Sequence, residues 1–324
     1  MLPTGLLTLT DRGLYCERGG FYIDPIRSVE KAVITHAHSD HARPGMRHYL
    51  THTNTIPLLH HRIARSISCT GIDYGEVVMM NGVSVSLFPA GHMVGSAQIR
   101  VEAEGEIWVV SGDYKRGPDP YATPFEPVQC HTFITESTFG LPIYHWPSDA
   151  EIIDDILRWR NANEACGIAS AIQCYSLGKA QRLVGLLSPF VSLITSPTIH
   201  AANVCLRQSG IPIAATSVLH NATTHQDLLK GLTLATSAKD FDDVPSARST
   251  GVTMAFASGW TATEPGRRRN AGAGFTLSDH VDWDDLMTTI SDTNAEHIIV
   301  THGFESEVVQ YLLETGRSAE VLAQ

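Results

Sequence analysis

The sequence lacks the features that mark membrane-spanning, secreted and cysteine-zinc proteins. No run of apolar residues approaches the roughly 20 needed to cross a bilayer. The N-terminus has no basic segment followed by an apolar one, as a secretory signal would have. The six cysteines are scattered, with no C-x-x-C pair, which argues against a cysteine zinc site and favours a reducing compartment. We therefore expect a cytoplasmic protein that makes no membrane contact.

Positive charge is also scarce. The formal net charge of −11 excludes a protein that holds nucleic acid through a broad basic surface. The one dense basic run is residues 267–269, three arginines that include Arg268. This run has two interpretations, a solvated loop and a local phosphate contact. If the protein binds nucleic acid, we therefore expect its binding site to contact only a few nucleotides.

Histidine, by contrast, is abundant, with 16 in 324 residues. Imidazole suits metal binding and proton transfer near neutral pH. Several histidines lie in no recognisable pattern and are expected to be ordinary surface or core residues: His48, His52, His60, His61, His145, His200 and His225. The excess still indicates metal or proton-transfer chemistry elsewhere in the chain.

Polar or ionisable residues repeatedly follow apolar strand candidates. The strand expected at residues 31–35 runs into His36, and the alternating strand at 83–88 breaks shortly before His92. The full set is Asp24, His36, His92, Asp113, Glu136 and His302. Residues at strand ends converge on one edge of a sheet, so we expect these side chains to form one site.

The middle of the chain changes to alternating helices and strands. A helix is expected over residues 149–161, started by Ser148, then a strand over 167–174 and a helix over 179–187. This alternation predicts a small α/β unit. The earlier pattern of strands returns near residue 252.

The strongest motif is H-x-H-x-D-H, which starts at His36. On an extended segment His36 and His38 point the same way and can reach one metal ion. Asp40 and His41 follow where the chain turns, and they face a second position. The motif therefore predicts a two-metal hydrolase, with a histidine-rich loop that binds no metal as the alternative.

One loop cannot complete two metal sites, because each ion needs three or four ligands and one position for water. His92, on a glycine-flanked loop, and Asp113 are the next candidates. An aspartate can bridge two metals with its two oxygens, which a histidine cannot do. His302 completes the second site.

With these residues, the chain resembles the metallo-β-lactamase superfamily and, within it, the β-CASP nucleases. The resemblance implies an α/β (α+β) fold: an αββα sandwich formed by residues 1–140 and 253–324, with an inserted β-CASP domain at 141–252. It implies two divalent ions, zinc with manganese as the alternative. It implies ligand sets of His36, His38, His92 and Asp113, and of Asp40, His41, Asp113 and His302. Asp24 would orient the histidine loop.

Further segments resemble β-CASP motifs. Glu136 stands in the first, His280 in the second and His302-Gly303 in the third, where the family often has Glu after Gly and this chain has Phe304. That departure leaves the partner of His302 open. A helix-start motif at 175–182 is typical of phosphate binding, with an ordinary helix start as the alternative; its candidate residues are Ser176, Gly178, Lys179 and Gln181.

By the same resemblance we expect three residues to act on the substrate. Asp40 would orient or deprotonate the attacking water, His280 would protonate the leaving oxygen, and Glu136 would hold His280. Flanking segments resemble the bacterial ligase-associated DNA exonucleases, often labelled mRNA 3′-end processing factors. This resemblance predicts a metal-dependent DNA exonuclease that acts on single-stranded ends in DNA repair, alongside a DNA ligase or helicase.

Three alternatives remain open. The first is an RNA 3′-end processing endonuclease or exoribonuclease, because no residue decides the sugar. The second is a small-molecule hydrolase of thioesters or lactams, against which the inserted unit, Glu136 and His280 argue. The third is a scaffold that has lost its metals, against which the complete set of ligand candidates argues.

Overall fold

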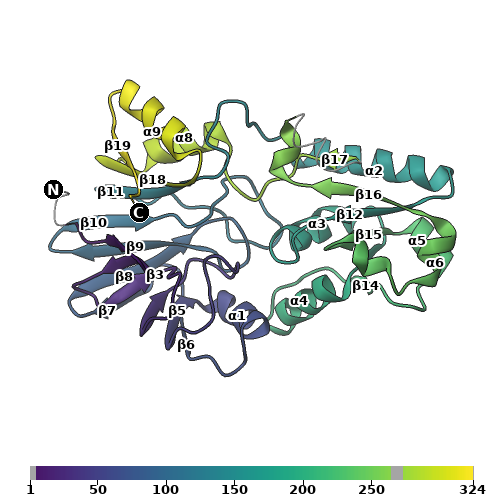
Figure 1. Cartoon of the computed structure of the whole chain (residues 1–324), viewed down its shortest axis with the longest axis horizontal. Coiled ribbons are helices and arrows are strands. Elements are labelled where there is room, and N and C mark those ends of the chain that lie inside the picture. Colours follow the sequence, from purple (N-terminus) through teal and green to yellow (C-terminus); the bar gives the residue numbers. More distant parts are fainter. Residues whose placement is uncertain (1–4, 264–272, 324) are drawn as a thin grey trace. The chain divides into compact units, whose positions relative to one another are not determined.

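The computed structural model describes residues 5–263 and 273–323, which form two compact units. The first unit comprises Met1–Tyr144 and His280–Gln324, and the second comprises His145–Asp279. The chain therefore crosses between the units twice, after Tyr144 and after Asp279. Both units mix helices and strands, so the chain is an α/β protein, as predicted (Figure 1).

The first unit contains a six-stranded sheet in sequence order, β1-β2-β3-β4-β5-β6. Strands β1 to β3 pair antiparallel, and β3 to β6 pair parallel. Their bounds are β1 Thr8–Thr10, β2 Gly13–Cys16, β3 Phe21–Ile23, β4 Lys31–Val33, β5 His48–His52 and β6 Cys69–Ile72. Helix α1 (Ile56–Arg62) connects β5 to β6.

A second sheet of the same unit has the order β19-β18-β11-β10-β9-β8-β7. Strands β7 to β10 form an antiparallel meander, and β10, β11, β18 and β19 run parallel. The bounds are β7 Val77–Met80, β8 Val83–Pro89, β9 Ala97–Ala103, β10 Glu106–Val110, β11 Thr132–Ser137, β18 His297–Gly303 and β19 Ser318–Val321. The predicted alternating strand at 83–88 is β8.

The two sheets enclose one apolar core. Phe21 and Val33 from the first sheet share this cluster with Val85 and Ile99 from the second. Burying each such side chain stabilises the fold by about 1.5–3 kcal/mol. The other face of the second sheet packs against α8 (Trp283–Asp292) and α9 (Glu305–Glu314), and Figure 1 shows both helices beside β18 and β11.

The second unit is a parallel sheet with the order β14-β13-β15-β12-β16-β17. Its strands are β12 Ala169–Gln173, β13 Leu193–Thr195, β14 Ser217–Val218, β15 Leu232–Ala235, β16 Val252–Ala257 and β17 Gly274–Phe275. In the described part of this unit the α-helices are α2 Asp149–Ala165, α3 Lys179–Leu187, α4 Pro197–Gln208, α5 His225–Lys230 and α6 Pro245–Thr250. The Ser148 hydroxyl caps α2 by accepting from the Glu151 N–H group, so the helix begins where predicted.

The second unit extends further along the chain than its predicted end at residue 252. Strand β16 pairs in parallel with β12, from Ala169↔Val252 to Gln173↔Phe256. Because these strands share one sheet, the segment after 252 continues the second unit to Asp279. The identification of the units as a metallo-β-lactamase domain and a β-CASP domain stays a prediction. No helix in the described parts of the chain is long and apolar enough to span a membrane.

Candidate metal centre

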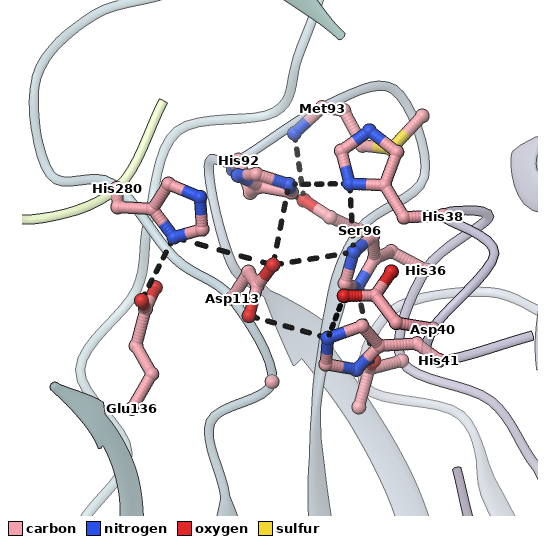
Figure 2. Close-up of polar contacts among 12 residues, drawn as sticks. His36, His38, Asp40, His41, His92, Met93, Ser96, Asp113, Glu136 and His280 are labelled. Carbon is pink, nitrogen blue, oxygen red and sulfur yellow. Dashed lines mark hydrogen bonds and ion pairs between the residues drawn. The ribbon is translucent and has the colours of Figure 1, made fainter. Parts of the chain in front are cut away.

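The predicted ligands come from strand ends of the first unit. His36 and His38 follow β4, His92 follows β8, and Asp113 follows β10. The side chains of these four residues point towards one another in Figure 2. Strand β4 belongs to the first sheet, whereas β8 and β10 belong to the second, so the ends of strands from both sheets bring these residues together from distant parts of the chain. The four side chains therefore converge as predicted, but at the ends of strands from two sheets rather than at one sheet edge.

These four residues form a compact ligand cluster, with their ligand atoms all within 4.8 Å of one another. His38 Nδ1 lies 3.1 Å from both His36 Nε2 and His92 Nε2. Asp113 Oδ2 lies 3.5 Å from His36 Nε2 and 3.8 Å from His92 Nε2. Ring nitrogens that face one another with their lone pairs repel unless a cation or proton lies between them. Three imidazoles and one carboxylate are a donor set that zinc accepts.

Thr35 and Asp24 orient His36. The Thr35 hydroxyl donates to Asp24 Oδ2 at 2.5 Å and lies 3.0 Å from His36 Nδ1. The network therefore assigns the ring proton to Nδ1 and leaves Nε2 as the acceptor that faces the cluster. Burial, together with the nearby His41, holds the pKa of His36 well below its usual value. The ring is therefore neutral, as a metal ligand must be. Thr35 is not among the predicted site residues, and its only signal in the sequence is its place directly before the motif.

Asp113 lies at the centre of the arrangement. Its Oδ1 is 3.4 Å from His41 Nε2, while its Oδ2 faces His36 and His92. Burial opposes ionisation, but His41 and His280 outweigh it and hold the pKa of Asp113 well below the usual range. The two oxygens thus face different histidines, which is the arrangement that a bridging carboxylate needs.

The second predicted ligand set is gathered less closely. His41 Nε2 lies 3.9 Å from Asp40 Oδ2, and the rings of His41 and His302 are 5.7 Å apart between centroids. Within residues 5–263 and 273–323, the only ligand clusters are His36 with His38, His92 and Asp113, and Asp113 with Glu136 and His280. The ligands of the first set therefore meet, and the second metal ion stays a prediction.

Gly303 explains the local conformation of the third motif. It has a φ of +106°, and a Cβ atom there would lie 2.3 Å from the carbonyl oxygen of Ser137. Only glycine fits such a position. Phe304 donates its backbone N–H to the same carbonyl at 3.0 Å, and Glu305 then begins α9. Nδ1 of His302 lies 3.3 Å from the hydroxyl of Thr301.

Asp24 holds the histidine loop. Its Oδ1 accepts from the Thr35 N–H at 2.9 Å, and its Oδ2 lies 2.7 Å from His41 Nδ1. Burial disfavours a charged ring, but Asp113 and Asp24 outweigh it and raise the pKa of His41 well above its usual value. With Nδ1 bonded to Asp24, Nε2 of His41 is left for a metal ion.

Asp24→Asn is expected to weaken metal binding about 10- to 100-fold, because an amide cannot accept all the hydrogen bonds of the carboxylate. Competition with a fluorescent chelator measures this affinity. Asp11→Asn is the matched control, since Asp11 is an exposed aspartate of the same unit that pairs with Arg27 at 2.8 Å. Equal affinities in both variants would show that Asp24 does not orient the ligands.

Glu136 and His280 meet beside the ligand cluster, as predicted. His280 Nδ1 lies 2.8 Å from Glu136 Oε2 and 4.0 Å from Asp113 Oδ2. Glu136 is buried and also accepts from the Tyr114 N–H at 2.8 Å and the Thr138 hydroxyl at 2.5 Å. These contacts fix the carboxylate, which in turn fixes the imidazole; their catalytic roles stay predictions.

The candidate phosphate residues lie in the second unit. Gly178 precedes α3 with a φ of +78°. Lys179 Nζ lies 3.4 Å from Asp279 Oδ2, and Gln181 Nε2 donates to the carbonyl of Ser176 at 3.0 Å. Lys179 and Gln181 therefore have partners inside the unit, and phosphate contact stays a prediction. Arg268 lies outside the described residues.

The structure thus defines an α/β protein with a histidine-rich cluster that could hold a metal ion and an adjacent Glu–His pair. No family model matches the chain. It is 29% identical over 321 residues to "Probable DNA ligase" of Opitutus terrae, which covers 96% of this chain and 30% of that protein. It is 29% identical over 133 residues to "Cleavage and polyadenylation specificity factor subunit 3" of Dictyostelium discoideum, and 28% over 123 residues to "Endoribonuclease YSH1" of Saccharomyces cerevisiae.

The last two matches cover 40% and 37% of this chain. The chain spans 30% of the length of the Opitutus relative and 16% of each of the other two. A solved structure of a protein of unknown function from Enterococcus faecalis shares the fold, with a TM-score of 0.61, 13% identity and coverage of 91% of this chain and 79% of that one. The relatives confirm the predicted resemblance to the β-CASP nucleases and to ligase-associated exonucleases.

Proposed function

We propose that this chain is a metal-dependent nuclease that hydrolyses phosphodiester bonds, acting as a DNA exonuclease on single-stranded ends in DNA repair. The observation that carries the proposal is the ligand cluster around Asp113 with the His280–Glu136 pair beside it. A metal centre with an adjacent imidazole suits displacement at phosphorus. The relative that covers 96% of the chain is named for a DNA ligase, which supports DNA and a ligase-containing repair system.

The proposal includes an αββα sandwich of the metallo-β-lactamase type with an inserted β-CASP domain. Two sheets that share one apolar core, with α8 and α9 packed on the second, support it. All six cysteines lie in the described part of the chain and are thiols rather than disulfides, which supports a cytoplasmic location.

We propose two divalent ions, zinc with manganese as the alternative. His36, His38, His92 and Asp113 would hold the first, and Asp40, His41, Asp113 and His302 the second. When bound, such ions lower the pKa of a water molecule towards neutrality and neutralise phosphate oxygens. The histidine and carboxylate donors of the first set support zinc.

The protein's own residues would then complete the reaction. The exposed Asp40 carboxylate would orient the attacking water and accept its proton. His280, whose Nδ1 is bonded to Glu136, would donate a proton from Nε2 to the departing oxygen. Glu136 would hold the ring in the orientation and tautomer that this transfer needs.

Matched single strands of DNA and RNA, labelled at either end and incubated with Zn²⁺ or Mn²⁺, test the proposal. We expect labelled mononucleotides from DNA, loss of the activity after chelation, and its return when metal is added back. Gel analysis of product lengths separates removal of terminal nucleotides from internal cleavage. An intact DNA strand under metal-loaded conditions would contradict the proposed function.

A second candidate function is an RNA 3′-end processing endonuclease or exoribonuclease. The relatives named "Endoribonuclease YSH1" and "Cleavage and polyadenylation specificity factor subunit 3" favour it, over 37% and 40% of the chain. Internal cleavage of RNA with DNA left intact would establish this alternative. Turnover of a thioester or lactam, with both nucleic acids intact, would instead identify a small-molecule hydrolase.

A further inference from the structure

Four charged side chains form an ion cluster in the second unit. Arg182, on α3, places Nη2 2.7 Å from Asp149 Oδ1 and Nη1 3.3 Å from Asp279 Oδ1. Lys179, one turn earlier on the same helix, lies 3.4 Å from the other oxygen of Asp279. Two cations thus face two carboxylates, and the cluster is balanced in charge.

Three of the four side chains are almost fully desolvated, while the Asp149 side chain is 23% exposed. Lys179 is 5% exposed, Arg182 7% and Asp279 4%. Removing charges from water is unfavourable, and the pairing of the charges often does no more than offset this cost. Such a cluster is therefore a weak source of stability. Its main effect is to fix the orientation of the groups it contacts, because the planar guanidinium of Arg182 holds its donors in a rigid arrangement.

The rigid guanidinium of Arg182 holds the two residues directly before His280 in place. Arg182 Nη1 donates to the carbonyl of Ser278 at 2.5 Å, in addition to facing Asp279. On the other side of His280, the Val281 N–H donates to the carbonyl of Tyr114 at 2.9 Å. The backbone is therefore held on both sides of the imidazole by independent contacts.

Arg182 also contacts a residue near the place where the chain first passes from the first unit into the second. Asp149, its second carboxylate partner, comes five residues after Tyr144, the last residue before the chain enters the second unit. In the first unit, the Tyr144 carbonyl accepts from the Trp283 N–H at 3.3 Å. One arginine thus ties the start and the end of the second unit together, next to the residue on which the proposed proton transfer depends.

We propose that Arg182 is a positioning residue for His280. Through Ser278 and Asp279 it fixes the backbone that carries the imidazole, and Glu136 then fixes the ring. Arg182 would thus act through this backbone. This inference rests on the proposed function, because it assigns Arg182 to the protonation of the leaving oxygen.

Arg182→Met replaces the guanidinium with an unbranched apolar side chain. Its activity on two phosphodiesters tests whether Arg182 positions His280. A DNA strand has a leaving group that needs a proton, whereas p-nitrophenolate departs from thymidine 5′-(p-nitrophenyl phosphate) without one. We expect kcat on DNA to fall about 10- to 100-fold, as displacement of a catalytic group by about 1 Å can cause. Metal content, KM and turnover of the p-nitrophenyl ester should stay within about twofold of the wild type.

The double variant Arg182→Met/His280→Ala should be no slower on DNA than His280→Ala alone, because residues that act through one group are not additive. Arg160→Met is the matched control. Arg160 is 8% exposed, bonds Glu164 at 2.5 Å and the carbonyls of Leu229 and Lys230, and belongs to the same unit. Arg160→Met should leave the ratio of turnover on DNA to turnover on the p-nitrophenyl ester unchanged.

Equal losses on both esters, or additive losses in the double variant, would overturn the positioning role. If Arg182→Met does not fold, Arg182→Lys keeps one charge but loses the planar guanidinium, and the same pair of esters decides the question. If the wild type cleaves neither DNA nor the p-nitrophenyl ester, the result would instead contradict the proposed function. The two failures are therefore distinguishable.

Discussion

Asp113→Ala is expected to lose bound metal and phosphodiester cleavage together. Its two oxygens face His41 on one side and His36 and His92 on the other, so its removal takes a ligand from both proposed sites. Loss of a residue that only orients a ligand costs about 10- to 100-fold in affinity or activity. Loss of a shared ligand should exceed about 100-fold in both. Metal analysis after dialysis, together with turnover on labelled DNA, measures the two effects.

Asp119→Ala separates this effect from a general loss of structure. The Asp119 side chain is 8% exposed, compared with 10% for Asp113, and it pairs with Lys115 at 3.2 Å in the same unit. Its loss should reduce stability without removing metal. Asp113→Ala with full metal content and activity would refute the bridging assignment.

Much of the candidate centre could be predicted because its residues follow apolar strands. His92 and Asp113 are 21 positions apart and follow β8 and β10. Because these two strands end at one edge of the second sheet, the two side chains meet there. A period-two pattern marks such strands locally, and pleated geometry then determines where their ends lie. The motif that begins at His36 is likewise local.

Contacts between distant segments could not be read from local patterns. The sequence around β16 resembles any short apolar strand, and only its pairing with β12, more than 80 positions earlier, assigns it to the second unit. Lys179 looks like a phosphate ligand at a helix start until Asp279, 100 positions later, lies beside it. Thr35 carries no motif of its own, and its hydrogen bonds alone show that it links Asp24 to His36.

His280→Ala is expected to keep the metal content near normal and to cut turnover on DNA by about 100-fold or more, the usual contribution of a positioned general acid. Its Nδ1 lies 4.0 Å from Asp113 Oδ2 but 2.8 Å from Glu136, so the imidazole is bonded to the carboxylate beside the ligand cluster. Removing the ring therefore leaves His36, His38, His92 and Asp113 in place. Metal analysis and single-turnover cleavage of labelled DNA measure the two quantities separately.

His297→Ala is the matched control for this substitution. His297 belongs to the same unit, has a side chain that is 31% exposed compared with 22% for His280, and also pairs with a glutamate, Glu320, at 3.2 Å. It should change neither metal content nor turnover. Loss of metal in His280→Ala would make His280 a ligand or a structural residue. Retained metal with lost cleavage of DNA, and retained cleavage of the p-nitrophenyl ester, would identify it as the group that protonates the leaving oxygen.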